Sequence, residues 1–126
     1  MQTSPAKIFE MVLTPQPGGA PSLAVLEVRG FLDARAIPDF DHDVQRCMDE
    51  GFTRFILDTH DLTYISSAGI GSLMRLSQNL ARLGGEIVLL PPPDKIYAIF
   101  ELLDFTKVLK FVETKEQAVE ALRENG

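Results

Sequence analysis

The chain has 126 residues, 45% of which are apolar, and it carries a formal net charge of −6 at pH 7. This length and apolar content predict one globular domain with a full hydrophobic core, and they exclude an intrinsically disordered chain. The acidic balance argues against nucleic acid as a partner, because binding to a phosphate backbone requires clustered Lys and Arg.

The first half of the chain predicts two strands, a helix and a third strand. Apolar segments over residues 7–14 and 22–30 are typical of strands, and the Pro- and Gly-rich stretch over 15–21 predicts a loop between them. Residues 31–35 predict a turn that contains Asp33. A helix follows and ends at Gly51, and residues 54–58 predict a short buried strand. One face of that helix carries Phe40, Val44, Cys47 and Met48.

A second helix follows a connection over residues 61–65. Ser66 or Ser67 can cap its first turn, and Gly84 with Gly85 ends it. Residues 86–90 then predict another buried strand. The core face of the helix is expected to comprise Ile70, Leu73, Met74, Ser77, Leu80 and Ala81.

The remaining residues predict two more helices with a strand between them. Asp94 is expected to cap the third helix, and residues 108–112 predict the last strand. Thr114 and Gln117 form a capping box that opens a final helix through Leu122.

This order of elements predicts the fold class. After the first strand, strands and helices alternate, which implies right-handed crossovers and an α/β fold. We expect a mostly parallel sheet of about four to five strands with helices packed on it. No repeat or second domain is visible, so we expect one domain over residues 1–126, with loose ends at 1–6 and 123–126.

The start of the second helix has an unusual composition. Gly69 and Gly71 lie in its first turns, where each Gly costs about 1 kcal/mol relative to Ala. The gain we expect is a close approach of the backbone, either to a neighbouring strand or to a partner protein. A serine hydroxyl at this helix N-terminus is well placed to carry a phosphate. Spacing alone favours the interpretation that Ser67 is only the cap of the helix.

Asp33 is expected to lie near this helix start. Functional loops of parallel sheets gather beyond the carboxyl ends of the strands, so Asp33 and Ser67 should share one edge if their strands are neighbours. The alternative is that Asp33 is a turn residue with an Asx bond. Either Met74 or Leu73 is expected to be partly exposed, and an apolar patch beside Ser67 would mark a docking surface.

No catalytic, metal or cofactor site is predicted. Gly69 and Gly71 lack the third Gly of a dinucleotide fingerprint, and Ile65 stands where a nucleophile elbow needs Gly. Asp58 and Asp61 resemble a metal pair only weakly, and turn or capping roles fit them better. His42 and His60 are far apart in the sequence and have no predicted catalytic partner.

The composition also excludes several cellular contexts. A single cysteine, Cys47, allows no intramolecular disulfide, and its place on an apolar helix face predicts a buried thiol. No apolar run is long enough to cross a bilayer, and the first residues lack the apolar core of a signal peptide. We therefore expect a cytoplasmic protein with no membrane span.

Two segments, LEVRGFLDARAI over 26–37 and FILDTHDLTYISSAGIGSLM over 55–74, carry a resemblance to a known family. They resemble the STAS domain of bacterial anti-sigma factor antagonists, and the resemblance extends from about Lys7 to Leu122. It implies a STAS-like fold and a non-enzymatic protein that binds an anti-sigma factor with serine-kinase activity. In that family the kinase phosphorylates a serine at the start of the second helix, which weakens the complex, and a serine phosphatase resets it.

By position, the resemblance assigns the phosphoacceptor to Ser67 and the family's turn aspartate to Asp33. The segment around them, which we expect to contact the partner, comprises Asp33, Ile65, Ser66, Ser67, Ala68, Gly69 and Met74. One departure is Ser66, because the family commonly has an acidic residue there. Ser66 is therefore a second candidate acceptor. The departure also leaves open a role as a non-catalytic subunit of a scaffold or of a lipid-transport complex.

Overall fold

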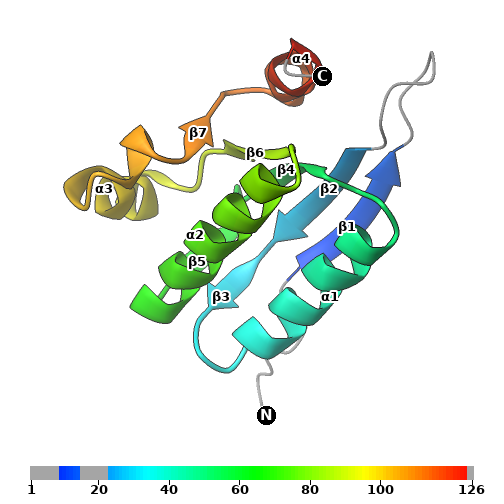
Figure 1. Ribbon diagram of the computed structural model, residues 1–126. Helices are drawn as coiled ribbons and strands as arrows, with labels where there is room; N and C mark the ends of the chain where they lie inside the picture. Colours follow the sequence, from blue (N-terminus) through cyan, green and yellow to red (C-terminus); the bar gives the residue numbers. More distant parts are fainter. Residues whose placement is uncertain (1–8, 15–22, 125–126) are drawn as a thin grey trace.

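The computed structural model describes residues 9–14 and 23–124, and Figure 1 shows how their elements are arranged. The expected loop over 15–21 and the expected loose end at 1–6 lie outside these residues. The described chain forms an α/β fold, as the order of its elements predicts.

The main sheet has five strands in the order β1-β2-β4-β6-β7. The antiparallel edge strand β1 (Phe9–Thr14) pairs with β2 (Leu23–Val28), and the remaining neighbours are parallel. They are β4 (Arg54–Asp58), β6 (Glu86–Leu90) and the two-residue β7 (Lys110–Phe111). The mostly parallel sheet is therefore confirmed.

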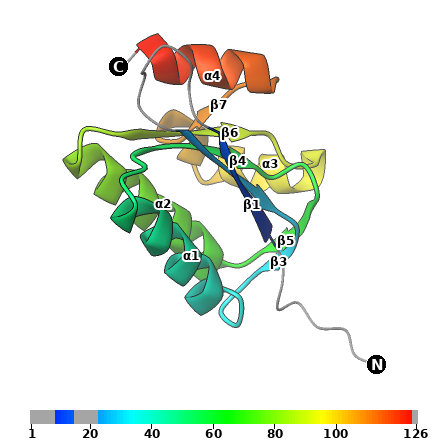
Figure 2. The ribbon, with the colours of Figure 1, turned by 90° about the vertical axis from the view of Figure 1, so that its right-hand side faces the viewer.

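Two hydrophobic clusters cover the two faces of this sheet. Helices α1 (Ile37–Asp49) and α2 (Ser67–Arg82) lie on one face, and α4 (Lys115–Glu124) lies on the other (Figure 2). Along β2, Ala24 and Leu26 belong to the larger cluster, whereas Leu23 and Val25 belong to the cluster under α4. This alternation follows from the two-residue period of a strand.

A second, smaller sheet was not expected from the sequence. Residues assigned to a turn and to a connection instead form two short parallel strands, β3 (Gly30–Leu32) and β5 (Leu62–Ile65). Strands of three or four residues are too short to show a clear period. Their buried side chains, Leu32 and Ile65, join the main core.

Two predictions about helix ends are wrong in detail. Asp94 is the first residue of α3 (Asp94–Leu102) rather than its cap, which is Pro93, and no side chain caps this helix. Helix α4 continues through Glu124, so residues 123 and 124 are helical and not a loose end.

Two further predictions, about a core residue and the last strand, also differ from the structure. Ala81, expected in the core, is exposed near the end of α2. The last strand is limited to Lys110–Phe111, after the 3-10 turn η2 (Phe105–Lys107).

Two other predictions are confirmed. The Gln117 amide donates to the Thr114 hydroxyl at 3.0 Å, and the Thr114 amide donates to Gln117 Oε1 at 3.2 Å, as in a capping box. Cys47 is only 1% exposed, and burial is the main cause that raises its thiol pKa from 9.0 to about 11. Cys47 is therefore a core side chain.

Candidate functional site

The small sheet brings the two segments of the candidate site together. Leu32 at the end of β3 pairs with Ile65 at the end of β5, and the Ser66 amide donates to the Leu32 carbonyl at 3.1 Å. Asp33 and Ser66 directly follow these two strand ends. The expectation that Asp33 and the helix start share one edge is therefore met by the backbone.

Ser66 is the residue that caps α2. Its Oγ accepts a hydrogen bond from the Gly69 amide at 3.1 Å and lies 3.5 Å from the Leu32 carbonyl, to which it can donate. The hydroxyl is half-buried between β3 and the first turn of the helix. Ser66 thus has a structural role that satisfies one of the free amides of the helix.

Ser67 is the first residue of α2 and has a different environment. Its side chain is exposed, and no hydrogen bond to its hydroxyl is recorded among the described residues. The first turn of α2 contains no acidic residue. An anion attached at this position would face the unpaired amides and the positive end of the helix dipole, which stabilises it by about 0.3–1 kcal/mol.

The two glycines of this helix start have unequal roles. A Cβ on Gly69 would clash with the Leu32 carbonyl oxygen and would lie 2.9 Å from Ile65 Cγ1. The predicted close approach is therefore confirmed at Gly69, and the neighbour is strand β3 of the same chain. At Gly71 no strand of the chain comes close, because the nearest atom to an added Cβ is Arg75 Nη1 at 3.7 Å. The expected approach of a partner to Gly71 stays a prediction.

Asp33 shapes the loop between β3 and α1. Its Oδ1 accepts hydrogen bonds from the Arg35 amide at 3.1 Å and the Ala36 amide at 3.3 Å. Its carbonyl oxygen accepts from the Ala36 and Ile37 amides. The Asx-turn interpretation of Asp33 is therefore confirmed. The side chain is half-buried, so part of it remains accessible beside the start of α2.

An exposed aromatic pair lies beside these residues and was missed by the sequence analysis. Phe31 and Tyr64 are cross-strand partners in the small sheet, with ring centroids 5.5 Å apart and planes tilted by 42°. They are 46% and 47% exposed, whereas their neighbours Leu32 and Ile65 are buried. No sequence signal marked this pair, because strands of three and four residues are too short to show a two-residue period.

The other expected contact residues differ in exposure. Ala68 is exposed, and Met74 is half-buried against the main core, as expected. Ile65 and Gly69 are buried, so they shape the site from beneath and offer little surface to a partner.

A polar cluster between α1 and α2 was also missed. The buried Ser72 hydroxyl donates to Asp41 Oδ1 at 2.7 Å, and Arg75 Nη2 lies 3.5 Å from Asp41 Oδ2. These contacts fix the position of α2 against α1. The expected core face of this helix included Ser77 and not Ser72, so no local signal pointed to this contact.

The described residues contain no group of three or more side chains suited to hold a metal ion. His42 and His60 are both exposed, and Asp58 accepts a hydrogen bond from the His60 amide at 3.0 Å, which is a turn role. Among the helices of the described ranges, none combines the length and apolar content of a membrane span.

Comparison with known proteins identifies the family. The model of the STAS domain matches residues 13–118, and the chain therefore belongs to the STAS domain family. A relative in Bordetella bronchiseptica, named "Putative anti-sigma factor antagonist BtrV", is 25% identical over 96 residues, which cover 76% of this chain and 83% of the relative.

Solved structures show the same fold. The anti-sigma factor antagonist SpoIIAA in its unphosphorylated form superposes with a TM-score of 0.68 at 20% identity, covering 91% of this chain and 97% of SpoIIAA. The phosphorylated form of SpoIIAA from Bacillus gives a TM-score of 0.66 at 19% identity, covering 90% and 97%. This chain therefore has a SpoIIAA-like STAS fold.

Proposed function

We propose that this chain is a non-catalytic, cytoplasmic anti-sigma factor antagonist, which binds a serine-kinase anti-sigma factor and is released when the kinase phosphorylates Ser67. The observation that carries this proposal is the position of the Ser67 hydroxyl. It is exposed and without a recorded partner at the first residue of α2, beside the Asp33 loop and the Phe31–Tyr64 pair. The name of the Bordetella relative and the two phosphorylation states of SpoIIAA support it.

The surface around Ser67 suits a protein partner. Phe31 and Tyr64 offer about half of their side-chain surface to solvent, and Ala68 and the half-buried Met74 belong to the same helix as Ser67. Aromatic side chains held in one orientation dominate many protein interfaces, because they bury a large area with little loss of conformational entropy. We expect the Phe31–Tyr64 pair to anchor the partner, and the partner to cover the start of α2.

Phosphorylation would act at the interface rather than on the fold. A phosphate adds about −1.5 to −2 charges and three acceptor oxygens. The stabilisation at the helix terminus is about 0.3–1 kcal/mol, which is too small to rearrange a packed domain. Two unit charges about 4 Å apart interact by roughly 1 kcal/mol in water and roughly 4 kcal/mol at an effective dielectric near 20. A phosphate that faces an acidic group of the partner would therefore weaken binding by tenfold or more.

Ser67 is a better acceptor than Ser66 on physical grounds. Phosphorylation of Ser66 would sacrifice the hydrogen bond that its Oγ accepts from the Gly69 amide, in a half-buried position. The Ser67 hydroxyl takes no part in this hydrogen bond, so its phosphorylation would leave the helix cap intact. No acidic residue stands at position 66 or within the first turn of α2.

The test is a phosphorylation reaction. The protein is incubated with a partner anti-sigma kinase and ATP, and the product is analysed by intact mass and by peptide mapping. We expect one added phosphate on Ser67, which Ser67→Ala abolishes and Ser66→Ala retains, and which a serine phosphatase removes. A phosphate that persists in Ser67→Ala would contradict the assignment. No phosphorylation by any co-occurring kinase would instead favour the scaffold or lipid-transport role.

A further inference from the structure

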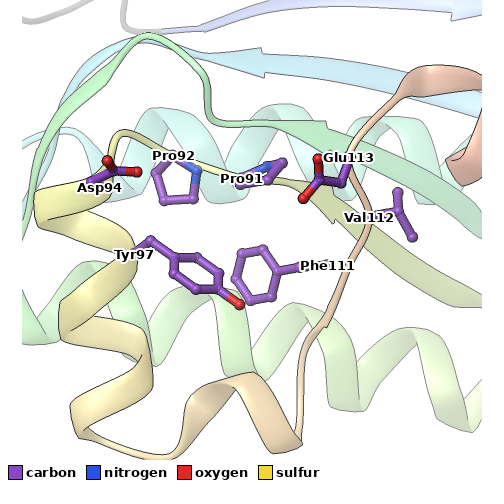
Figure 3. Close-up of a pocket in the computed structure, with 7 residues that line it drawn as sticks. All are labelled: Pro91, Pro92, Asp94, Tyr97, Phe111, Val112 and Glu113. Carbon is purple, nitrogen blue, oxygen red and sulfur yellow. The ribbon is translucent and has the colours of Figure 1, made fainter.

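A pocket with a volume of about 350 Å³ lies at the carboxyl ends of β6 and β7, against the first turns of α3 (Figure 3). Ligand sites of α/β proteins occur beyond the carboxyl ends of parallel strands, and β6 and β7 are parallel neighbours. The described lining consists of Pro91, Pro92, Asp94, Tyr97, Phe111, Val112 and Glu113.

Aromatic rings form one wall of this pocket. Tyr97 and Phe111 meet edge to face, with centroids 5.2 Å apart and an interplanar angle of 86°. Phe111 also packs edge to face on the fully buried Phe100 at 5.6 Å, so its ring is held from behind by the core. Both pocket rings are half-buried and are therefore fixed while still accessible.

The charges that line the described pocket are all negative. In Figure 3 the carboxylates of Asp94 and Glu113 lie at opposite ends of the Pro91–Pro92 pair, with the two rings below the prolines. Both side chains are exposed, and neither carboxylate has an ion pair or hydrogen bond recorded within the described ranges. The Glu113 backbone is held by its amide, which donates to Gln117 Oε1 at 2.8 Å.

We propose that this pocket binds an organic cation, namely a guanidinium or alkylammonium group on a short apolar stem. Ring faces attract such cations, planar guanidinium groups stack on aromatic rings, and carboxylates form charge-assisted hydrogen bonds with both groups. Two carboxylates without cationic neighbours in the lining repel anions.

The size and rigidity of the pocket fit this class of ligand. Its volume is at the lower end of the range of about 300–1,000 Å³ that small-molecule sites occupy, so it accepts a group of side-chain size. The prolines restrict the wall opposite the rings, because each fixes its own backbone φ. A ligand here would contact both α3 and β7, and so would hold the helix against the edge of the sheet.

The experiment is a titration of the full chain, labelled with ¹⁵N, using capped arginine (N-acetyl-arginine amide), agmatine, and the neutral isostere N-acetyl-citrulline amide. We expect saturable shifts of the backbone amides in residues 94–97 and 111–113 with both guanidinium compounds, and at least about tenfold weaker binding of the citrulline compound. Tighter binding of agmatine identifies a free amine-type metabolite as the ligand, and tighter binding of capped arginine identifies a peptide side chain.

Variants separate the site from a general attraction of cations to an acidic protein. Glu113→Gln removes one pocket charge and Tyr97→Leu removes one ring, and each should weaken the binding of capped arginine by about threefold to tenfold. Glu116→Gln removes an exposed carboxylate of α4 outside the pocket lining and should leave binding unchanged. The proposal is overturned if no saturable shifts occur, if citrulline binds as well as arginine, or if Glu113→Gln and Glu116→Gln have equal effects.

Discussion

The Ser66 amide donates a 3.1 Å hydrogen bond to the Leu32 carbonyl, and this contact ties the start of α2 to the end of β3. The same carbonyl oxygen is the atom that a Cβ on Gly69 would strike. The start of α2 is therefore packed against the β3 strand end, and the exposed surface of the site rests on this packing.

The two glycines at the start of α2 should respond oppositely to alanine. Gly69→Ala should destabilise the protein by about 1–3 kcal/mol, because backbone atoms of β3 must shift to admit the methyl group. Gly71→Ala should stabilise it by up to about 1 kcal/mol, because Ala is favoured in a helix and the added Cβ meets nothing closer than 3.7 Å. Urea unfolding measures both changes, and destabilisation by Gly71→Ala comparable to that by Gly69→Ala would contradict this packing.

Alanine substitutions of Ser66 and Ser67 should have unequal effects on the stability of the fold. Ser66→Ala should lower the free energy of unfolding by about 1 kcal/mol, because the Gly69 amide loses its acceptor. Ser67→Ala should change it by less than about 0.5 kcal/mol, because the Ser67 side chain is exposed. Thermal or urea unfolding of the two variants provides the comparison. Equal losses would show that the helix cap is shared between the two residues.

Cys47 gives a prediction about alkaline pH. Because the thiol pKa is raised from 9.0 to about 11 in the folded protein, the unfolded state releases its proton first as the pH rises. The free energy of unfolding should therefore fall between pH 9.0 and about 11, by up to about 3 kcal/mol, and below pH 9.0 the stabilisation by the protonated thiol should be fully present.

Cys47→Ala is the matched control, because it lacks this titration and keeps every other alkaline group. Its decline in the free energy of unfolding over the same pH range should be smaller than that of the unaltered chain. Alkylation adds a second measurement: the buried thiol should react with iodoacetamide at pH 8 only after unfolding. Parallel pH profiles of the two proteins would rule out the raised pKa.

The aromatic pair should contribute to partner binding without contributing much to stability. Phe31→Ala and Tyr64→Ala each remove an exposed ring and should weaken binding to the anti-sigma factor by about tenfold or more, as anchor residues do. Leu102→Ala is the control, because Leu102 is an exposed apolar residue of α3, 82% accessible and outside the candidate site. Surface plasmon resonance measures all three affinities, and an equal effect of Leu102→Ala would place the interface elsewhere.

The main elements could be predicted from the sequence because their hydrophobic patterns are long enough to have a period. The face of α1 over Phe40, Val44 and Cys47 is such a pattern, and it is buried as expected. The strands β3 and β5 have only three and four residues, so their sequences are equally compatible with the turn and the connection that were predicted there.

Contacts between distant residues were not predictable for a different reason. Ser72 and Asp41 are 31 positions apart, and nothing in either local segment specifies that they meet. The choice between Ser66 and Ser67 as the cap also required the structure, because both residue types suit that position. In the structure the Gly69 amide donates to the Ser66 hydroxyl, so Ser66 is the cap.

The central claim is tested most directly by isothermal calorimetry of the anti-sigma factor with the unaltered chain, Ser67→Ala and Ser67→Asp. We expect Ser67→Ala to bind as tightly as the unphosphorylated chain, even after incubation with ATP. We expect Ser67→Asp to bind at least about tenfold more weakly, because a negative charge then stands at the interface. Equal affinities of Ser67→Ala and Ser67→Asp would contradict the account.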